Sequence, residues 1–320
     1  MSDRSGGAGG HAGPAPGRPA DADRAGEEPL LHAVDVDGVR IACHEWRPEC
    51  RGAGPSVLLA HATGFHARVW DPVLRRLPGR HVVAVDSRGH GRSDKPPITH
   101  WRVFGEDLAA VADAFDLRGA VGVGHSMGGH ALVDAAAARP GRFARLILLD
   151  PVIVAPEVYG GGWTLTGVGV HPTAKRRRHF DSPEAMIERF RDRPPYAAFH
   201  PEALRAYCEH GLLPRADGEG FELACPPETE ASVYMTSRTN ADVYRSLRAL
   251  EMPVLVVRAK EPPPERDLMD FSSSPTWPGL VRELRHGREL FLPDRSHFIP
   301  MESPDEVATW IEAELRAAEA

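Results

Sequence analysis

One short stretch of this sequence constrains the fold more than any other. The apolar run Ala120 to Val123 leads into Gly124-His125-Ser126-Met127-Gly128, and small residues from Gly129 to Ala138 follow it. This pattern predicts a strand, a sharp turn and a helix, with Ser126 on the turn. The glycines on either side of the serine remove Cβ atoms that would collide there, so its hydroxyl stands clear of the sheet.

A glycine-x-serine-x-glycine pattern also occurs by chance, and this chain of 320 residues contains 31 glycines. The flanking strand and helix are the context that a nucleophile elbow requires, which favours the functional interpretation. In such an elbow, the following helix directs free N–H groups at an anion that forms beside the serine oxygen. Ser126 is therefore the candidate nucleophile.

Composition limits the other classes of function. With 42% hydrophobic and 26% charged residues, the chain can bury a large core as one domain with an insertion, or as two domains. The net charge of -7 disfavours a nucleic-acid partner. The four cysteines lack the spacing of a metal site or a disulfide framework, and no apolar run reaches the roughly 18 residues of a membrane span. We expect a cytoplasmic protein without a metal.

The order of the elements predicts the architecture. Residues 1–28 lack the apolar side chains that a core needs, so we expect a disordered tail. The stretches 31–36 and 39–46 alternate around Asp37-Gly38, which predicts a hairpin of edge strands. Continuous apolar runs follow, as expected for parallel strands that are covered on both faces, and helix-length stretches separate them. These runs lie at 57–60, 82–85, 146–149 and 254–257, and the helix-length stretches at 68–77, 101–115 and 129–138. A last strand is expected at 289–292.

The long connection between the runs that end at Leu149 and begin near Pro253 exceeds what one crossover needs. Helix-like pieces at 182–191 and 202–212 lie within it. We therefore expect a helical cap at 152–235, inserted into a core formed by 29–151 and 236–320. The final helix is expected to begin at Ser303 with a capping box and to run to about residue 318.

At about residues 30–318 the chain resembles the α/β-hydrolase superfamily. Four motifs carry the resemblance, in the order expected for that family: His61-Ala62-Thr63-Gly64-Phe65, Asp86-Ser87-Arg88-Gly89-His90-Gly91-Arg92-Ser93-Asp94, the elbow, and Ser296-His297-Phe298. The resemblance implies a mostly parallel eight-stranded sheet with helices on both faces and a helical cap insertion. It also implies that His297 is the base that activates the serine, whereas His61 and His125 are structural.

An oxyanion that forms on the substrate needs two preorganised donors. The resemblance implies that the N–H of Met127 is the first donor and the N–H of Thr63 the second, with Gly64 as an alternative. Ala62 stands where the family usually has glycine, so this loop departs from the family pattern.

The acid that orients the base departs from the common family pattern. Most members carry it shortly after the strand that corresponds to 254–257, but the acidic residue there is Glu261, beside a stiff run of prolines. Other members use a carboxylate at the end of the preceding strand, where this chain has Asp150. We expect Asp150 to be the acid, with Glu261 as the alternative and Asp267 or Asp270 as further candidates. Asp150 could also merely cap its turn.

These features together predict a serine hydrolase that cleaves a small or medium carboxylic ester or lactone through an acyl-enzyme on Ser126. The arrangement requires no cofactor. Perhydrolysis with haloperoxidase activity, hydrolysis of a carbon–carbon bond, and ligand binding with little turnover remain alternatives on the same fold. Aromatic side chains expected to line an apolar substrate pocket are those of Phe65, Trp70, Trp163 and Phe298.

Overall fold

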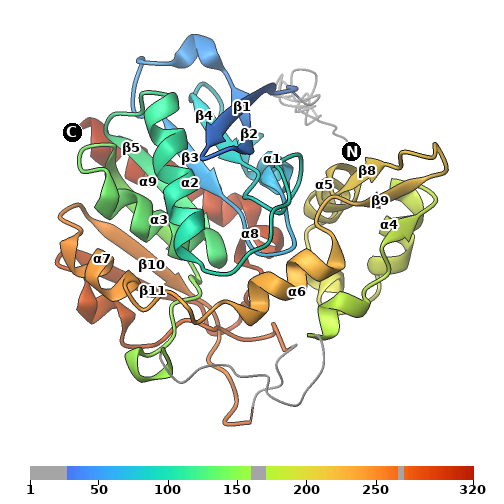
Figure 1. The fold of residues 1–320 in the computed structure, drawn as a ribbon. Coiled ribbons are helices and arrows are strands. Elements are labelled where there is room, and N and C mark those ends of the chain that lie inside the picture. The colour runs from blue at the N-terminus through green and yellow to red at the C-terminus, as the bar shows by residue number, and fades with distance from the viewer. Residues whose placement is uncertain (1–26, 160–170, 266–269) are drawn as a thin grey trace, which may run out of the picture.

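The computed structural model describes residues 27–159, 171–265 and 270–320, so nearly all of the expected disordered tail lies outside the described residues. Eight strands form one sheet in the order β1-β2-β4-β3-β5-β6-β10-β11 (Figure 1). Only β2 runs against the others, which confirms the predicted mostly parallel sheet. The strands are β1 (Leu30–Val36), β2 (Val39–Trp46), β3 (Val57–Ala60), β4 (Val82–Val85), β5 (Ala120–His125), β6 (Phe143–Leu149), β10 (Val254–Arg258) and β11 (Gly287–Phe291).

The first two strands form the predicted hairpin. Val36 pairs with Val39, and Asp37 and Gly38 make the turn with φ values of 53° and 81°. Both residues occupy the left-handed region, which matches the right-handed twist of the two strands. The hairpin places an antiparallel edge on the sheet.

The continuous apolar runs are explained by two cores, one on each face of the sheet. On β3, Leu58 and Ala60 pack into one core, whereas Val57 and Leu59 pack into the other. Because successive side chains of a strand point to opposite faces, a strand covered on both faces needs apolar residues throughout. Helices α2 (Arg102–Ala114), α3 (Met127–Ala138) and α7 (Val243–Ala249) supply the first core, and α1 (Asp71–Leu74), α8 (Ile299–Glu302) and α9 (Pro304–Glu319) the second (Figure 1).

The predicted capping box at the start of α9 does not form. The Ser303 side chain makes no cap hydrogen bond to α9. Instead its hydroxyl accepts a hydrogen bond of 2.8 Å from Arg295 Nε, and Arg295 Nη2 lies 3.0 Å from Glu306. The arginine therefore engages both side chains on which the box depends, and the prediction is wrong because a tertiary contact replaced the local one.

The inserted segment is only partly helical. It contains α4 (Pro183–Phe190), α5 (Pro201–His210) and α6 (Pro227–Met235), and α4 begins as predicted, with the Ser182 hydroxyl accepting from Ala185 N at 3.2 Å. A three-stranded sheet of β7 (His179–Phe180), β9 (Phe221–Leu223) and β8 (Leu212–Pro214) was not predicted. Its strands are too short for a periodic signal. In Figure 1, α4, α5, β8 and β9 gather beside the main sheet, and α6 lies between them and the core. The division into core and cap stays a prediction.

Short 3-10 helices complete the described backbone. They are η1 (Pro48–Cys50), η2 (Ala67–Trp70), η3 (Pro156–Val158), η4 (Pro172–Lys175), η5 (Tyr196–Ala198) and η6 (Leu280–Glu283). The stretch 68–77, expected to be one helix, is divided between η2 and α1. Pro72 near the start of α1 lacks the N–H that would continue the hydrogen bonding of η2.

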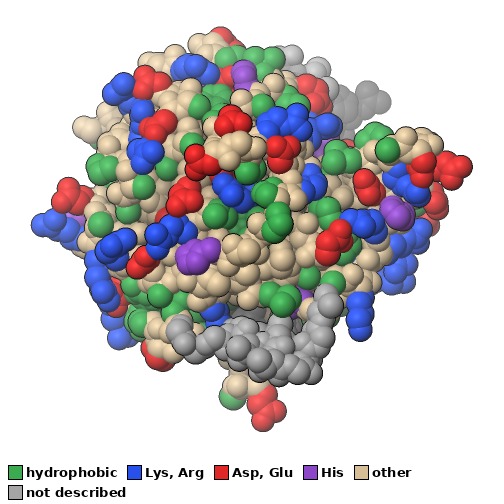
Figure 2. Space-filling model, in the orientation of Figure 1, with side chains coloured by type: hydrophobic (Ala, Val, Ile, Leu, Met, Phe, Trp, Pro, Cys, Tyr) green, Lys and Arg blue, Asp and Glu red, His purple; other side chains and the backbone are tan. Residues whose placement is uncertain are grey.

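The described residues can be searched for membrane-spanning helices, disulfides and metal sites. None of their helices is both long and apolar enough to cross a bilayer. The four cysteines, all of which are described, are free thiols, and no group of three or more candidate metal ligands occurs among the described side chains. Figure 2 shows acidic and basic side chains interspersed over the visible face.

Candidate active site

Ser126 occupies the turn between β5 and α3. Its backbone has φ 58° and ψ -118°, a conformation that L-residues rarely adopt. The flanking glycines permit it: a Cβ on Gly124 would lie 2.5 Å from Gly128 O, and one on Gly128 would lie 2.4 Å from Ala60 O. These glycines are required by close backbone packing, as the sequence predicts for a nucleophile elbow.

Three side chains that are distant in sequence form one hydrogen-bonded chain at this turn. Ser126 Oγ lies 2.9 Å from His297 Nε2, and His297 Nδ1 lies 2.7 Å from Asp150 Oδ2. The three residues come from the end of β5, the loop after β11 and the end of β6, and all are buried. The arrangement can move a proton from the hydroxyl to the imidazole while the carboxylate stabilises the resulting cation.

The other candidate acids do not reach the histidine. The Glu261 side chain is 61% exposed, and its carboxylate lies 3.3 Å from Arg258 Nη1. Asp270 accepts a hydrogen bond from Ser272 N at 2.8 Å. Asp267 lies outside the described residues. Of the carboxylates that the structure describes, Asp150 is therefore the one placed to orient His297.

Asp150 is held in place by donors on both of its oxygens. Oδ1 accepts from Ala259 N at 3.1 Å and from the hydroxyl of Ser274, while Oδ2 faces His297. The Asp150 backbone has φ 46°, and its N–H donates to Val257 O at 2.7 Å. Loops after β6 and β10 thus fix a strained residue in one orientation. The sequence signal was only its position at a strand end.

The two histidines expected to be structural have structural contacts. His125 Nε2 donates to the backbone carbonyl of His297 at 2.8 Å, which anchors the loop that carries the candidate base. Burial holds the pKa of His125 well below its ordinary value, so this ring is neutral. His61 Nδ1 donates to Ala62 O at 2.7 Å, and its Nε2 accepts from Ser87 N at 3.0 Å.

The loop that follows β3 carries the second expected oxyanion donor. The N–H of Gly64 donates to His90 Nε2 at 3.0 Å, so this group is already used. This leaves Thr63 as the candidate from the loop, together with Met127 at the first position of α3, where the helix provides no acceptor for a backbone N–H. Burial lowers the pKa of His90 to about 4, which keeps its ring neutral and able to accept. His90 was not singled out by the sequence.

A cavity of about 370 Å³ opens above Ser126 and His297. Phe65 and Phe298, two of the four predicted aromatic residues, line it. Trp70 does not; it is fully buried in the core beside α1. Trp163 lies outside the described residues. The sequence missed Tyr234 and Phe271, which also line the cavity, because neither belongs to a motif.

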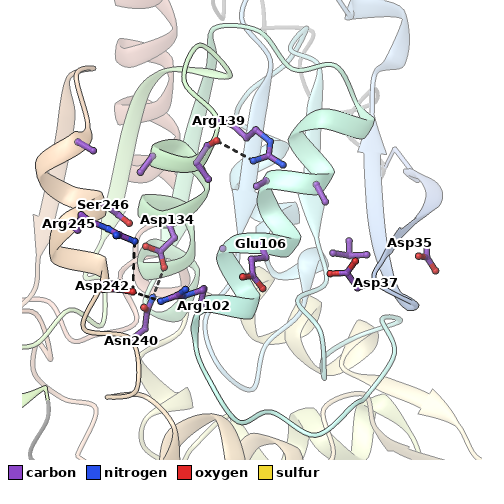
Figure 3. Close-up of a pocket in the computed structure, with 17 residues that line it drawn as sticks. Asp35, Asp37, Arg102, Glu106, Asp134, Arg139, Asn240, Asp242, Arg245 and Ser246 are labelled. Carbon is purple, nitrogen blue, oxygen red and sulfur yellow. Dashed lines mark hydrogen bonds and ion pairs between the residues drawn. The ribbon is translucent and has the colours of Figure 1, made fainter.

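A larger hollow of about 790 Å³ lies elsewhere, among α2, α3 and α7 (Figure 3). Three of its charged side chains form ion pairs within the hollow: Arg245 lies 3.9 Å from Asp242, which also binds Arg102. Asp134 accepts from Asn240 at 2.5 Å. Neither Ser126 nor His297 lines this hollow, so size alone does not identify the candidate active site.

Comparison with known proteins adds to this geometry. Residues 57–310 match the sequence model of the alpha/beta hydrolase family. The lipase LipV of Mycobacterium tuberculosis is 30% identical over 268 residues, which cover 82% of this chain and 94% of the lipase. A non-heme chloroperoxidase of Streptomyces lividans is 38% identical over 136 residues, which cover 40% of this chain and only 48% of that enzyme. The 2-(acetamidomethylene)succinate hydrolase of Mesorhizobium japonicum is 27% identical over 75% of this chain and 81% of its own.

Solved structures show the same fold. The crystal structure of E-2-(acetamidomethylene)succinate hydrolase has a TM-score of 0.67 at 23% identity and covers 90% of this chain and 99% of its own. A thioesterase domain from the curacin biosynthetic pathway has a TM-score of 0.65 at 19% identity, covering 89% of this chain and 100% of its own. At these identities the likeness concerns the arrangement of the backbone.

Proposed function

This chain belongs to the alpha/beta hydrolase family of enzymes, and we propose that it is a serine hydrolase that cleaves a small or medium carboxylic ester or lactone. The observation that carries the proposal is the hydrogen-bonded chain from Ser126 Oγ through His297 to Asp150. A hydroxyl is a poor nucleophile at neutral pH, and this chain supplies the base and the carboxylate that it needs.

The proposed reaction begins when Ser126 Oγ attacks the carbonyl carbon while its proton passes to His297 Nε2. The carbonyl oxygen becomes an oxyanion, which accepts hydrogen bonds from the N–H groups of Thr63 and Met127. Collapse of this intermediate expels the alcohol oxygen, which takes the proton from His297 and leaves an acyl group on Ser126. In a lactone the alcohol stays attached to the acyl group.

Water then completes the cycle. It gives a proton to His297 and attacks the acyl carbonyl, and collapse of the second intermediate returns the proton to Ser126 and releases the acid. Asp150 stays ionised and stabilises the imidazolium in both halves of the cycle. The cavity of about 370 Å³ favours substrates of small or medium size. We also propose that the segment 152–235, whose Tyr234 and Met235 line this cavity, is the cap that selects the substrate.

A fluorophosphonate probe tests the nucleophile. It should label the native protein and leave Ser126→Ala unlabelled, and kcat on 4-nitrophenyl esters should fall by several powers of ten in that variant. Ser246→Ala, in the hollow of Figure 3, is the matched control and should be labelled like the native protein. Labelling of folded Ser126→Ala at the native rate would refute the assignment.

A second candidate function is cofactor-free perhydrolysis with haloperoxidase activity, and the similarity to the chloroperoxidase of Streptomyces lividans favours keeping it. Hydrolysis of a carbon–carbon bond and ligand binding with little turnover use the same cavity. Peroxide-dependent bromination in acetate buffer, compared with ester turnover, separates the first alternative from hydrolysis. Labelling by the probe without turnover of any ester would favour one of the others.

A further inference from the structure

A second cavity, of about 230 Å³, adjoins the one above Ser126. The two share the side chains of Thr63, Phe65, Tyr234, Phe271 and Phe298. Ser126 and His297 line only the first cavity. The second cavity, here called the side chamber, therefore leads away from the candidate nucleophile past the loop that carries Thr63.

The side chamber has a polar wall, and the rest of its lining is formed mainly by aromatic side chains and prolines. Arg176 donates to the Tyr207 hydroxyl at 2.9 Å, to the Tyr196 hydroxyl at 3.2 Å, and to the carboxylate of Glu230. Glu230 and Tyr207 are buried. Each of these four side chains lies on a different stretch of the segment expected to be the cap, so the wall is assembled by its tertiary structure. The catalytic steps above use none of them.

Hydrogen-bonding capacity remains on this wall. A guanidinium has five N–H donors, and the bonds to Glu230, Tyr196 and Tyr207 use three of them. The Arg176 Nε–H has no acceptor in the part of the chain that the structure describes. A purely apolar group in the side chamber would remove water from these donors without replacing its hydrogen bonds, which is unfavourable.

The charge of the wall is already balanced. Glu230 neutralises Arg176, and burial raises the pKa of the Glu230 carboxyl despite the neighbouring guanidinium. A ligand carboxylate would bring a second negative charge next to Glu230 in a buried site with one cation. An uncharged acceptor, such as a ketone or amide oxygen, can use the remaining donors without that repulsion.

The position of the side chamber indicates which arm of the substrate enters it. The leaving oxygen must take a proton from His297, so the leaving group occupies the part of the first cavity that His297 lines. The acyl arm then points the other way, past Thr63. Glu230 also packs against Gly64, where a Cβ would lie 2.8 Å from Glu230 Oε1, so the wall lies beside the expected oxyanion loop.

We propose that the side chamber is an acyl subsite that selects esters whose acyl chain ends in an uncharged hydrogen-bond acceptor. Arg176 and its tyrosine partners donate hydrogen bonds to that acceptor. The proposal rests on the proposed serine-hydrolase function and adds the substrate class to it. An apolar chain passes the rings of Phe65, Phe271 and Phe298, and its terminal oxygen accepts from the polar wall.

The test uses matched 4-nitrophenyl esters. For each chain length, an alkanoate is compared with its analogue that carries a ketone one carbon from the end, in the series 4-oxopentanoate, 5-oxohexanoate and 7-oxooctanoate. The glutarate monoester provides a carboxylate at the position of the ketone in 5-oxohexanoate. We expect kcat/KM for one or more oxo esters to exceed the matched alkanoate about tenfold, as one well-placed buried hydrogen bond implies. The kcat/KM for the 5-oxohexanoate ester should also exceed that for the glutarate monoester.

Variants then assign the preference to the polar wall. Arg176→Met combined with Glu230→Leu removes both charges, so that neither is left buried without its partner. In this double variant the ratio of kcat/KM for the oxo ester to kcat/KM for the matched alkanoate should fall to within twofold of unity. Arg176→Leu combined with Glu230→Met also removes both charges, so it gives an independent measurement if the first double variant does not fold. Arg178→Met, which loses a surface pair with Glu228, is the matched control and should keep the preference.

The outcomes separate the subsite from the function. If alkanoates are hydrolysed but no oxo ester is preferred at any length, or if the glutarate monoester is preferred, the subsite proposal is overturned while the hydrolase proposal stands. If the preference survives in the first double variant, or in the second when the first does not fold, the polar wall is not its cause and the proposal fails. If no ester is hydrolysed and the fluorophosphonate does not label Ser126, the proposed function fails first.

Discussion

Replacing Asp150 with asparagine should remove most of the activity without disturbing the fold. The Asp150 Oδ1 atom accepts from Ala259 N, whose hydrogen cannot turn away, and from the hydroxyl of Ser274. Ser274 Oγ itself accepts from Thr276 N at 3.1 Å, so its own hydrogen is available to point at Asp150. The asparagine oxygen must therefore take the Oδ1 position, because an NH₂ group there would face two donors.

The amide nitrogen is thereby placed 2.7 Å from His297 Nδ1, at the position of Asp150 Oδ2. An N–H there needs an acceptor, so the ring adopts the tautomer with its proton on Nε2, and it can no longer accept from Ser126. Loss of the correct tautomer costs about 10⁴ in kcat, the magnitude known for the equivalent change in a serine protease. At about 1.36 kcal/mol for each tenfold change, this is about 5.4 kcal/mol of transition-state stabilisation.

The assay is kcat and KM on a 4-nitrophenyl ester at neutral pH, with circular dichroism as the check on folding. KM should change little, because Asp150 is fully buried behind His297 and does not line the cavity. Glu261→Gln is the matched control and should stay within about tenfold of native, because this side chain is exposed and pairs with Arg258, away from His297. A folded Asp150→Asn with more than a tenth of native kcat, beside a nearly inactive Glu261→Gln, would refute the reasoning.

Three further predictions follow from the packing around the site. His90→Ala should lower kcat about ten- to a hundredfold at nearly constant KM in steady-state assays, because the N–H of Gly64 loses the acceptor that orients the loop beside it. Gly128→Ala should sharply lower the melting temperature in thermal denaturation, because its Cβ would lie 2.4 Å from Ala60 O. Burial lowers the pKa of His61 to about 3 and that of His90 to about 4, from 6.5. Below about pH 6.5 the folded state therefore binds fewer protons than the unfolded state does. The free energy of unfolding should fall as the pH drops from about 6.5 towards 4, by up to about 1.4 kcal/mol per pH unit for each ring. Urea midpoints measured across that range at constant ionic strength check the last prediction, and a flat profile would contradict it.

Local sequence was sufficient wherever local geometry decides the structure. The hairpin at Asp37-Gly38 needs two residues at positive φ, and the elbow at Ser126 needs glycines where the backbones touch. Buried parallel strands need unbroken apolar runs because both of their faces are covered. These requirements act within a few residues, so the strand–turn–helix at Ser126 and the mostly parallel sheet could be predicted without coordinates.

Contacts between distant segments could not be predicted in this way. The predicted capping box at Ser303 does not form, because the Ser303 hydroxyl accepts a hydrogen bond from Arg295 instead. Trp70 lies in the core and not beside the cavity. The short strands of the inserted sheet carry no periodic signal, so pairing with one another decides their structure. The wall around Arg176 is formed by four stretches that share no motif.

The choice between Asp150 and Glu261 shows most clearly what local sequence predicts and what long-range packing decides. Each follows an apolar strand, and by sequence alone either carboxylate could meet His297. The order of the sheet places β6 directly beside β5, so Asp150 emerges next to Ser126 and reaches the histidine, whereas Arg258 engages Glu261 at the surface. The sequence thus determined which residue types stand at the strand ends, and the tertiary structure decided which carboxylate meets the imidazole, because the order of parallel strands is set by long-range packing.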